Sequence, residues 1–108
     1  MADYTEYVPN VAKYTASVDD AAVKGIVRHC GIALQKRDSS LVAFSDKSER
    51  DRVRNNFLIK KLALTSPEAD LDAAVVAVGE ALKGEHDKSR VTVYYLQAEK
   101  FGKLDMFH

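Results

Sequence analysis

Apolar residues recur at intervals of three and four along most of the chain, which is the spacing of one face of an α-helix. Between residues 17 and 36, with Ser17 as a candidate N-cap, five of them fall within about 80° of arc in helical projection. Ala21, Gly25 and Ile32 add a second apolar strip on the opposite side, so we expect this helix to be the central one. The five residues of the first strip are Val23, Ile26, Val27, Cys30 and Leu34.

Three more segments carry the same period together with helix end signals. One begins at Ser45 and runs to about Leu62, with Phe57 near the start of its buried face. Another lies between Pro67 and Gly84, with acidic residues early and a lysine late, as the helix dipole favours. A short helix is expected around Pro9. The predicted core stripes are Val53, Phe57, Leu58, Ile59 and Leu62 in the first, and Leu71, Val75, Val78 and Leu82 in the second.

Residues 91–96 could be a helix or a strand, because their β-branched and aromatic side chains favour extended structure. No second strand candidate exists to pair with them, and a lone strand leaves its backbone groups without partners. Asp87 as a cap and Gly102 as a C-terminal stop favour the helix. The residues therefore predict an all-α fold.

The expected architecture is a compact single-domain bundle of about five helices over residues 1–108, with an N-terminal helical segment at 1–17 and a core at 18–105. A faint internal similarity is compatible with two similar helical hairpins: DAAV occurs twice, 52 residues apart, and GIAL is matched by GEAL 48 residues later. Alanine-rich amphipathic helices also resemble one another by chance, so both readings stay open.

Composition narrows the classes of protein. Sixteen basic and sixteen acidic residues cancel. One cysteine allows neither an internal disulfide nor a four-cysteine zinc site. No run of about eighteen apolar residues is present and the start of the chain lacks the pattern of a signal peptide, so we expect a cytoplasmic protein with no membrane contact.

Four basic residues, Lys47, Arg50, Arg54 and Lys61, fall within about 60° of arc on the predicted helix from Ser45. They are the candidate partner-binding surface. They would contact phosphates in a nucleic-acid binder, but acidic residues interrupt the helix and the chain is neutral, so a solvated helix face is the ordinary interpretation.

His29 and Cys30 are the other candidate chemistry. Adjacent helical residues point about 100° apart, and the positions three and four residues from His29 hold no side chain that can ligate or activate. We therefore expect Cys30 to be a buried core residue and His29 to be buried or partly buried. His86, between two acids, is expected in a solvated loop. No catalytic motif, glycine-rich loop, metal-ligand set or cofactor signature occurs, so the sequence predicts no enzyme, no metal and no cofactor.

Two stretches carry a family resemblance: VKGIVRHCGIALQKRDSSLVAFSDKSERDRVRNNFLIKKLAL and KSRVTVYYLQAEKFGKL. Over about residues 18–105 the chain resembles a small bacterial family, domain of unknown function 2853. The resemblance implies a compact all-helical fold in a bacterial cytoplasm and implies no activity.

The function expected on these grounds is a small cytoplasmic helical module for protein interaction or for structure, with an unknown protein partner or a second copy of itself. One alternative is a weak, sequence-independent nucleic-acid binder that uses the four basic residues, with Tyr94 or Tyr95 for stacking. A second alternative is an enzyme without a recognisable motif.

Overall fold

The computed structural model describes residues 3–108, and these residues form helices and turns with no strand, which confirms the all-α prediction. Leu41 and Ser89 make one isolated antiparallel bridge. The α-helices are α1 (Val8–Ala12), α2 (Asp20–Cys30), α3 (Arg37–Ser40), α4 (Lys47–Arg52), α5 (Glu68–Ala81) and α6 (Arg90–Lys100). The 3₁₀ turns are η1 (Tyr4–Glu6), η2 (Gly31–Gln35) and η4 (Leu104–Phe107), and η3 (Val53–Lys61) is a π-helix.

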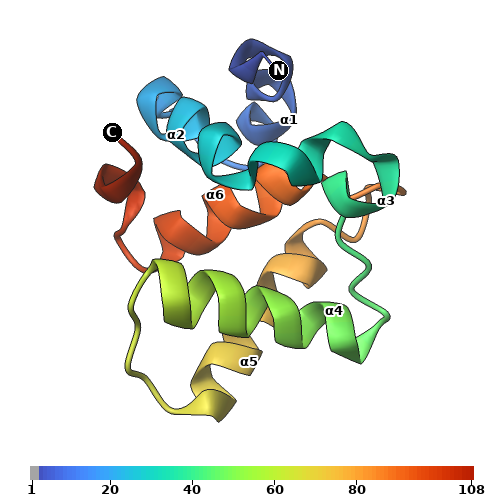
Figure 1. Cartoon of the computed structure of the whole chain (residues 1–108), viewed down its shortest axis with the longest axis vertical. Coiled ribbons are helices and arrows are strands. Elements are labelled where there is room, and N and C mark those ends of the chain that lie inside the picture. Colours follow the sequence, from blue (N-terminus) through green and yellow to red (C-terminus); the bar gives the residue numbers. More distant parts are fainter. Residues whose placement is uncertain (1–2) are drawn as a thin grey trace.

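Helix α6 lies at the centre of the molecule. It passes between one group of helices, α1, α2 and α3, and another, α4 with η3 and α5 (Figure 1). Nine of its eleven residues are buried. The β-branched segment 91–96 is therefore helical, because helices cover it on all sides and no second strand is available to pair with it.

The expectation that residues 17–36 form the central helix is wrong. Its first apolar strip packs as predicted, but Ala21 is exposed and the Ile32 side chain is 78% exposed. The helix ends at Cys30 because Gly31 has a φ of 50°, a left-handed conformation that glycine adopts without strain. The chain then continues as η2, which turns Ile32 outward.

Helices α4 and η3 form one continuous helix over the segment predicted from Ser45, although Asp46 rather than Ser45 caps it. Within η3 the hydrogen bonds span five residues, as in the 2.9 Å bond that the Leu62 N–H donates to the Phe57 carbonyl. The buried apolar side chains of this segment are Val53, Phe57, Leu58 and Leu62, all of which were predicted to be buried. Ile59, predicted to be buried, is 41% exposed because the wider turn rotates it off that face.

The core joins all the longer helices. The predicted α5 stripe is buried, with each side chain at most 5% exposed (Leu71, Val75, Val78 and Leu82). The Phe57 ring of η3 stacks on the Tyr94 ring of α6, with ring centroids 4.0 Å apart. The ring of Phe107, on η4, also stacks on Phe57, with centroids 5.9 Å apart. Aromatic contacts thus tie η3, α6 and the C-terminal turn together.

Gly25 allows η4 to dock on α2. A Cβ atom at this position would overlap the backbone carbonyl of Phe107, so only glycine lets the two segments approach this closely. At Gly31, by contrast, nothing lies within 4 Å of a Cβ atom built there, and this glycine contributes the backbone turn instead.

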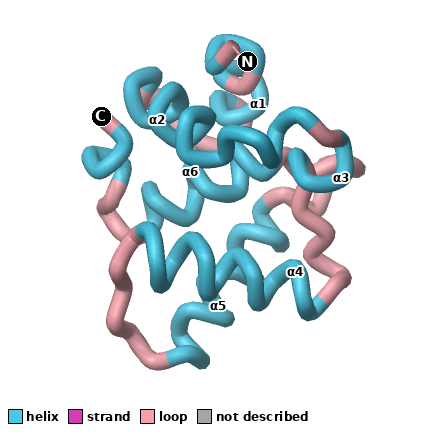
Figure 2. Tube along the Cα trace, viewed as in Figure 1, coloured by secondary structure: helices cyan, strands magenta, loops and turns pink. Residues whose placement is uncertain are grey.

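The helices pack less symmetrically than two equal hairpins would. Helix α5 packs on both α6 and η3, whereas α2 packs chiefly on α6 and η4. The tube in Figure 2 shows the long loops that separate α4 from α3 and α5 from η3. The internal similarity stays a hypothesis. Among residues 3–108, no helix combines the length and apolar character that a membrane span requires.

Candidate functional site

The four basic residues proposed as a partner surface do not form one exposed face, and Arg54 contradicts that expectation directly. Arg54 is 9% exposed and is surrounded by carboxylates: its Nη1 lies 2.7 Å from Asp72, 3.3 Å from Asp51 and 3.4 Å from Glu68. The hydrogen bond to Asp72 raises the pKa of the Arg54 guanidinium. Arg54 therefore fastens η3 to the start of α5 and is not available to a partner.

The other three basic residues point in different directions. Lys47 is exposed and pairs with a carboxylate of its own helix at 2.8 Å. Arg50 is half-buried and donates from Nη1 to the Phe44 carbonyl at 2.5 Å. Lys61 is half-buried, with its Nζ 5.4 Å from the centroid of the Phe107 ring. The π geometry of η3 moves only Arg54 and Lys61 relative to the predicted stripe, because each residue of η3 turns the chain by less than 100°. Lys47 and Arg50 lie on the regular helix α4.

His29 and Cys30 do not act as a pair. His29 is more exposed than the buried or partly buried residue that the sequence predicted, although its ring lies 5.8 Å from Phe57 and 6.2 Å from Tyr94 between centroids. Its partial burial and, to a smaller extent, the charge of Lys61 lower the pKa of His29. Among residues 3–108, no group of three histidine, cysteine or acidic side chains is placed to hold a metal ion.

Cys30 is half-buried rather than fully buried, yet burial of its thiol raises the pKa to about 12. The shift from the ordinary value of 9.0 leaves about a thousandfold less thiolate near pH 8, so we expect native Cys30 to react with a disulfide reagent at least about 100-fold more slowly than in the unfolded chain. Stopped-flow measurement of the reaction rate, without guanidinium for the native chain and with guanidinium for the unfolded chain, compares the Cys30 thiol in the two states. Equal rates in the two states would contradict the buried environment.

A buried ionic cluster that no spacing in the sequence revealed centres on Arg90. Its Nη2 lies 2.5 Å from Glu49 Oε1, its Nη1 donates to the Tyr94 hydroxyl at 3.0 Å, and its Nε donates to the Ser39 carbonyl at 2.6 Å. The same guanidinium also donates to the Leu41 carbonyl at 3.2 Å. Arg90 thereby joins α6 to α4 and to the loop after α3, which is a structural task.

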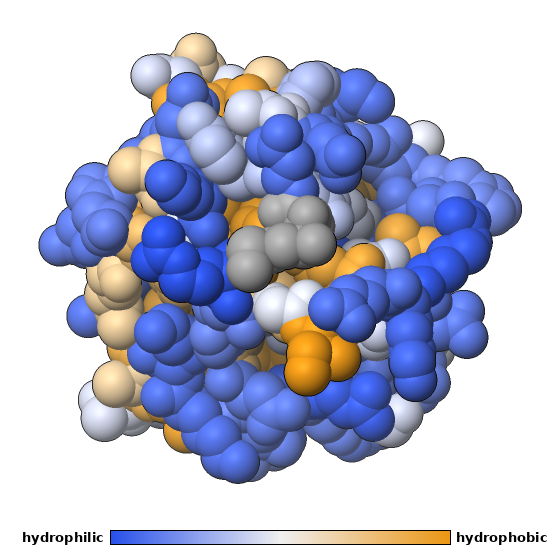
Figure 3. Space-filling model, turned by 45° about the horizontal axis from the view of Figure 1, so that its top comes forward, coloured by the Kyte–Doolittle hydropathy of each residue, from blue (hydrophilic) through white to orange (hydrophobic). Residues whose placement is uncertain are grey.

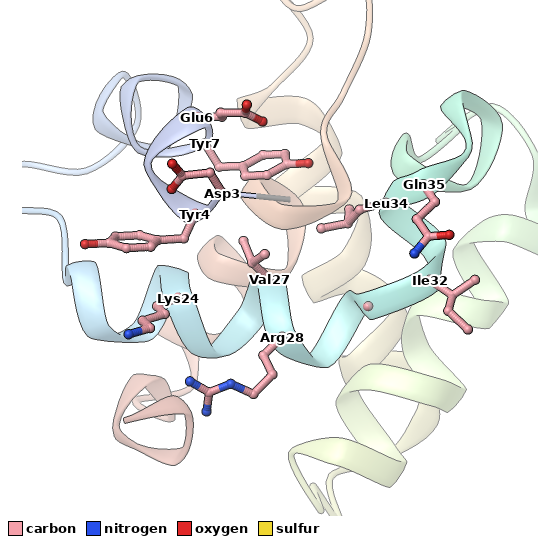
Figure 4. A pocket seen from close by; sticks show the side chains of 11 residues that line it. Asp3, Tyr4, Glu6, Tyr7, Lys24, Val27, Arg28, Ile32, Leu34 and Gln35 are labelled. Carbon is pink, nitrogen blue, oxygen red and sulfur yellow. The ribbon is translucent and has the colours of Figure 1, made fainter. Parts of the chain in front are cut away.

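A groove of about 1000 Å³ separates the N-terminal segment from α2 and η2. Tyr4 and Tyr7 line one side, and Val27 and Leu34 line the other; in Figure 4, Val27 points from α2 toward the ring of Tyr7. Ile32 stands at the end of the groove and points away from it (Figure 4). The sequence could not reveal this groove, because it exists only where η1 packs over α2.

Charged side chains border the groove with opposite signs on its two sides. Asp3 and Glu6 belong to the N-terminal side, and Lys24 and Arg28 to α2 (Figure 4). All four are exposed, and none of them forms an ion pair within 4 Å among the described residues. Figure 3, which looks toward this end of the molecule, shows apolar atoms exposed between hydrophilic ones. The groove thus combines an apolar floor with unpaired charges at its rim.

Comparison of the sequence with models of known protein families identifies the family of this chain. The model of the family described as "Protein of unknown function (DUF2853)" matches residues 6–105, so the chain belongs to that family. The match begins before residue 18 and includes Glu6 and Tyr7 of the groove wall, but not Asp3 and Tyr4. No curated protein is similar enough to the chain to count as a relative.

Proposed function

We propose that this protein is a small helical interaction module that docks through the groove between its N-terminal segment and α2, and that the occupant is a second copy of the chain. The observation that carries the proposal is the Ile32 side chain, 78% exposed at the end of the groove. A large aliphatic side chain beside an aromatic-lined hollow, with polar groups around it, has the composition of an interface core and its rim.

The charges at the rim favour a second copy as the partner. In a twofold dimer the same patch meets itself, so each residue contacts a different residue of the other copy. Asp3 and Glu6 of one copy then face the α2 side of the other copy's groove, where Lys24 lies, so charges of opposite sign meet. The net charge of +0 adds no overall repulsion between the copies.

The two alternative functions receive less support. Nucleic-acid binding through the predicted basic residues would require them to be available, but Arg54 is enclosed by carboxylates and Lys47 is paired. Catalysis by the only cysteine would require a thiolate, and burial disfavours one at Cys30. An interaction surface needs none of these groups.

Replacement of Ile32 by glutamate is expected to weaken self-association by at least about 100-fold. Two isoleucines are lost per dimer, and burying each contributes roughly 1.5–3 kcal/mol. Sedimentation equilibrium between about 10 µM and 1 mM measures the change, a range that brackets weak specific association. Wild type should be a salt-sensitive mixture of monomer and dimer.

Val76→Glu is the matched control, because Val76 is an exposed aliphatic residue, 49% accessible, on α5 and outside the groove. It should associate like wild type. A mixture of Glu6→Lys and Lys24→Glu chains should dimerise better than either variant alone, since the reversed charges are complementary. A wild-type chain that stays monomeric throughout the range would refute the second copy as occupant.

A further inference from the structure

A second, smaller cavity of about 210 Å³ lies where η4 docks against α2. Four basic side chains from three parts of the chain line it, and no acidic side chain does: Arg28 and His29 of α2, Lys61 of η3 and His108 beyond η4. Arg28 and Lys61 are cations, and the charge of Lys61 adds to burial in disfavouring the charged form of His29.

The docking of η4 builds the cavity. Gly25 lets the backbone of Phe107 lie against α2. The Phe107 ring then lies near His29 of α2 and Lys61 of η3. The Lys61 Nζ lies 5.4 Å from the centroid of that ring, and the His29 ring lies 6.3 Å from it between centroids. Lys61 of η3 and His29 of α2 thus line the same cavity, although they lie far apart in the sequence.

Most of this positive charge is not neutralised by the protein. His108 is compensated, since its Nε2 lies 2.6 Å from Asp19 Oδ2. Arg28 and Lys61 have no carboxylate within 4 Å among the described residues. His29 also lacks one, and the pKa of its imidazole is lowered by partial burial and then by the charge of Lys61.

We propose that this cavity binds a small oxyanion of the phosphate class, with Arg28 and Lys61 supplying charged donors and the His29 ring supplying an N–H donor. Charge-assisted hydrogen bonds from arginine and lysine to phosphate oxygens are short and strong. The volume lies below the 300–1,000 Å³ typical of sites for drug-sized ligands, so the group that it accommodates is inorganic phosphate or a terminal phosphate.

The test follows the His29 imidazole by NMR while inorganic phosphate is titrated at constant ionic strength against chloride. The His29→Gln variant assigns its signal among the three histidines. A bound anion stabilises the imidazolium, so phosphate should produce a saturable shift and raise the pKa of His29 by about 0.5–1 unit.

Lys61→Gln should weaken phosphate binding at least tenfold, a loss of about 1.4 kcal/mol. Lys60→Gln is the matched control, because it removes the same charge from the adjacent, exposed position of η3. Circular dichroism verifies that both variants fold, and the Ile32→Glu chain should bind phosphate like wild type because Ile32 does not line this cavity.

A shift that rises linearly and equally with phosphate and chloride would overturn the proposal, and so would equal losses in Lys60→Gln and Lys61→Gln. A single-stranded oligonucleotide serves as a further arm. If it shifts His29 at far lower concentration than phosphate, in a manner that depends on Lys61, the small-anion assignment is wrong and the cavity is part of a nucleic-acid surface.

Discussion

Replacement of Arg90 by methionine is expected to lower the free energy of unfolding by about 3–5 kcal/mol. The Arg90 side chain is 7% exposed and that of Glu49 is 13% exposed, so methionine would leave a nearly buried carboxylate without its main partner. It would also free the carbonyl oxygens of Ser39 and Leu41 from their donor. Urea denaturation followed by far-UV circular dichroism measures the loss.

Arg52→Met is the matched control for this result. Arg52 also pairs with Glu49, at 3.0 Å, but its side chain is 58% exposed, so its removal should cost less than about 1 kcal/mol. The double variant Arg90→Met with Glu49→Gln should recover part of the stability, because the uncompensated charge is gone. Equal losses for Arg52→Met and Arg90→Met would contradict the burial of this cluster.

Replacement of Phe57 by alanine is expected to destabilise the fold by about 3–5 kcal/mol. The Phe57 side chain is fully buried and its ring stacks on Tyr94, so truncation opens a cavity between η3, α6 and η4. Such a loss is a large part of the 5–15 kcal/mol that holds a typical domain folded. Thermal and urea unfolding should both report it.

The Ile59→Ala variant tests the π geometry of η3 through the same thermal and urea unfolding measurements. Because the wider turn leaves Ile59 at 41% exposure, the substitution should cost about 1 kcal/mol or less. A regular α-helix would place Ile59 about 60° from the buried Leu62, at the edge of the predicted buried face. A loss at Ile59 as large as that at Phe57 would therefore show that η3 does not adopt the π geometry.

Local signals were sufficient for the helices and for most of the core. The stripe on α5 was predicted residue by residue, since it is a regular α-helix whose buried face repeats at the ordinary period. The family resemblance agreed with these patterns, and the matched region also includes residues 6–17 of the N-terminal segment. The predicted basic stripe failed at Arg54 because α5, a different helix, brings the carboxylates of Glu68 and Asp72 to its guanidinium.

The sequence by itself determined which segments are helical, because helix periodicity and end signals act within a few residues of one another. Only the tertiary structure decided which helix is central, which basic side chains form ion pairs, and where the groove and the smaller cavity lie. α6 is central because helices cover all its sides, Arg54 is paired because α5 brings carboxylates to it, and Ile32 is exposed because Gly31 ends its helix. Each of these depends on contacts between segments distant in sequence, which a local pattern cannot specify.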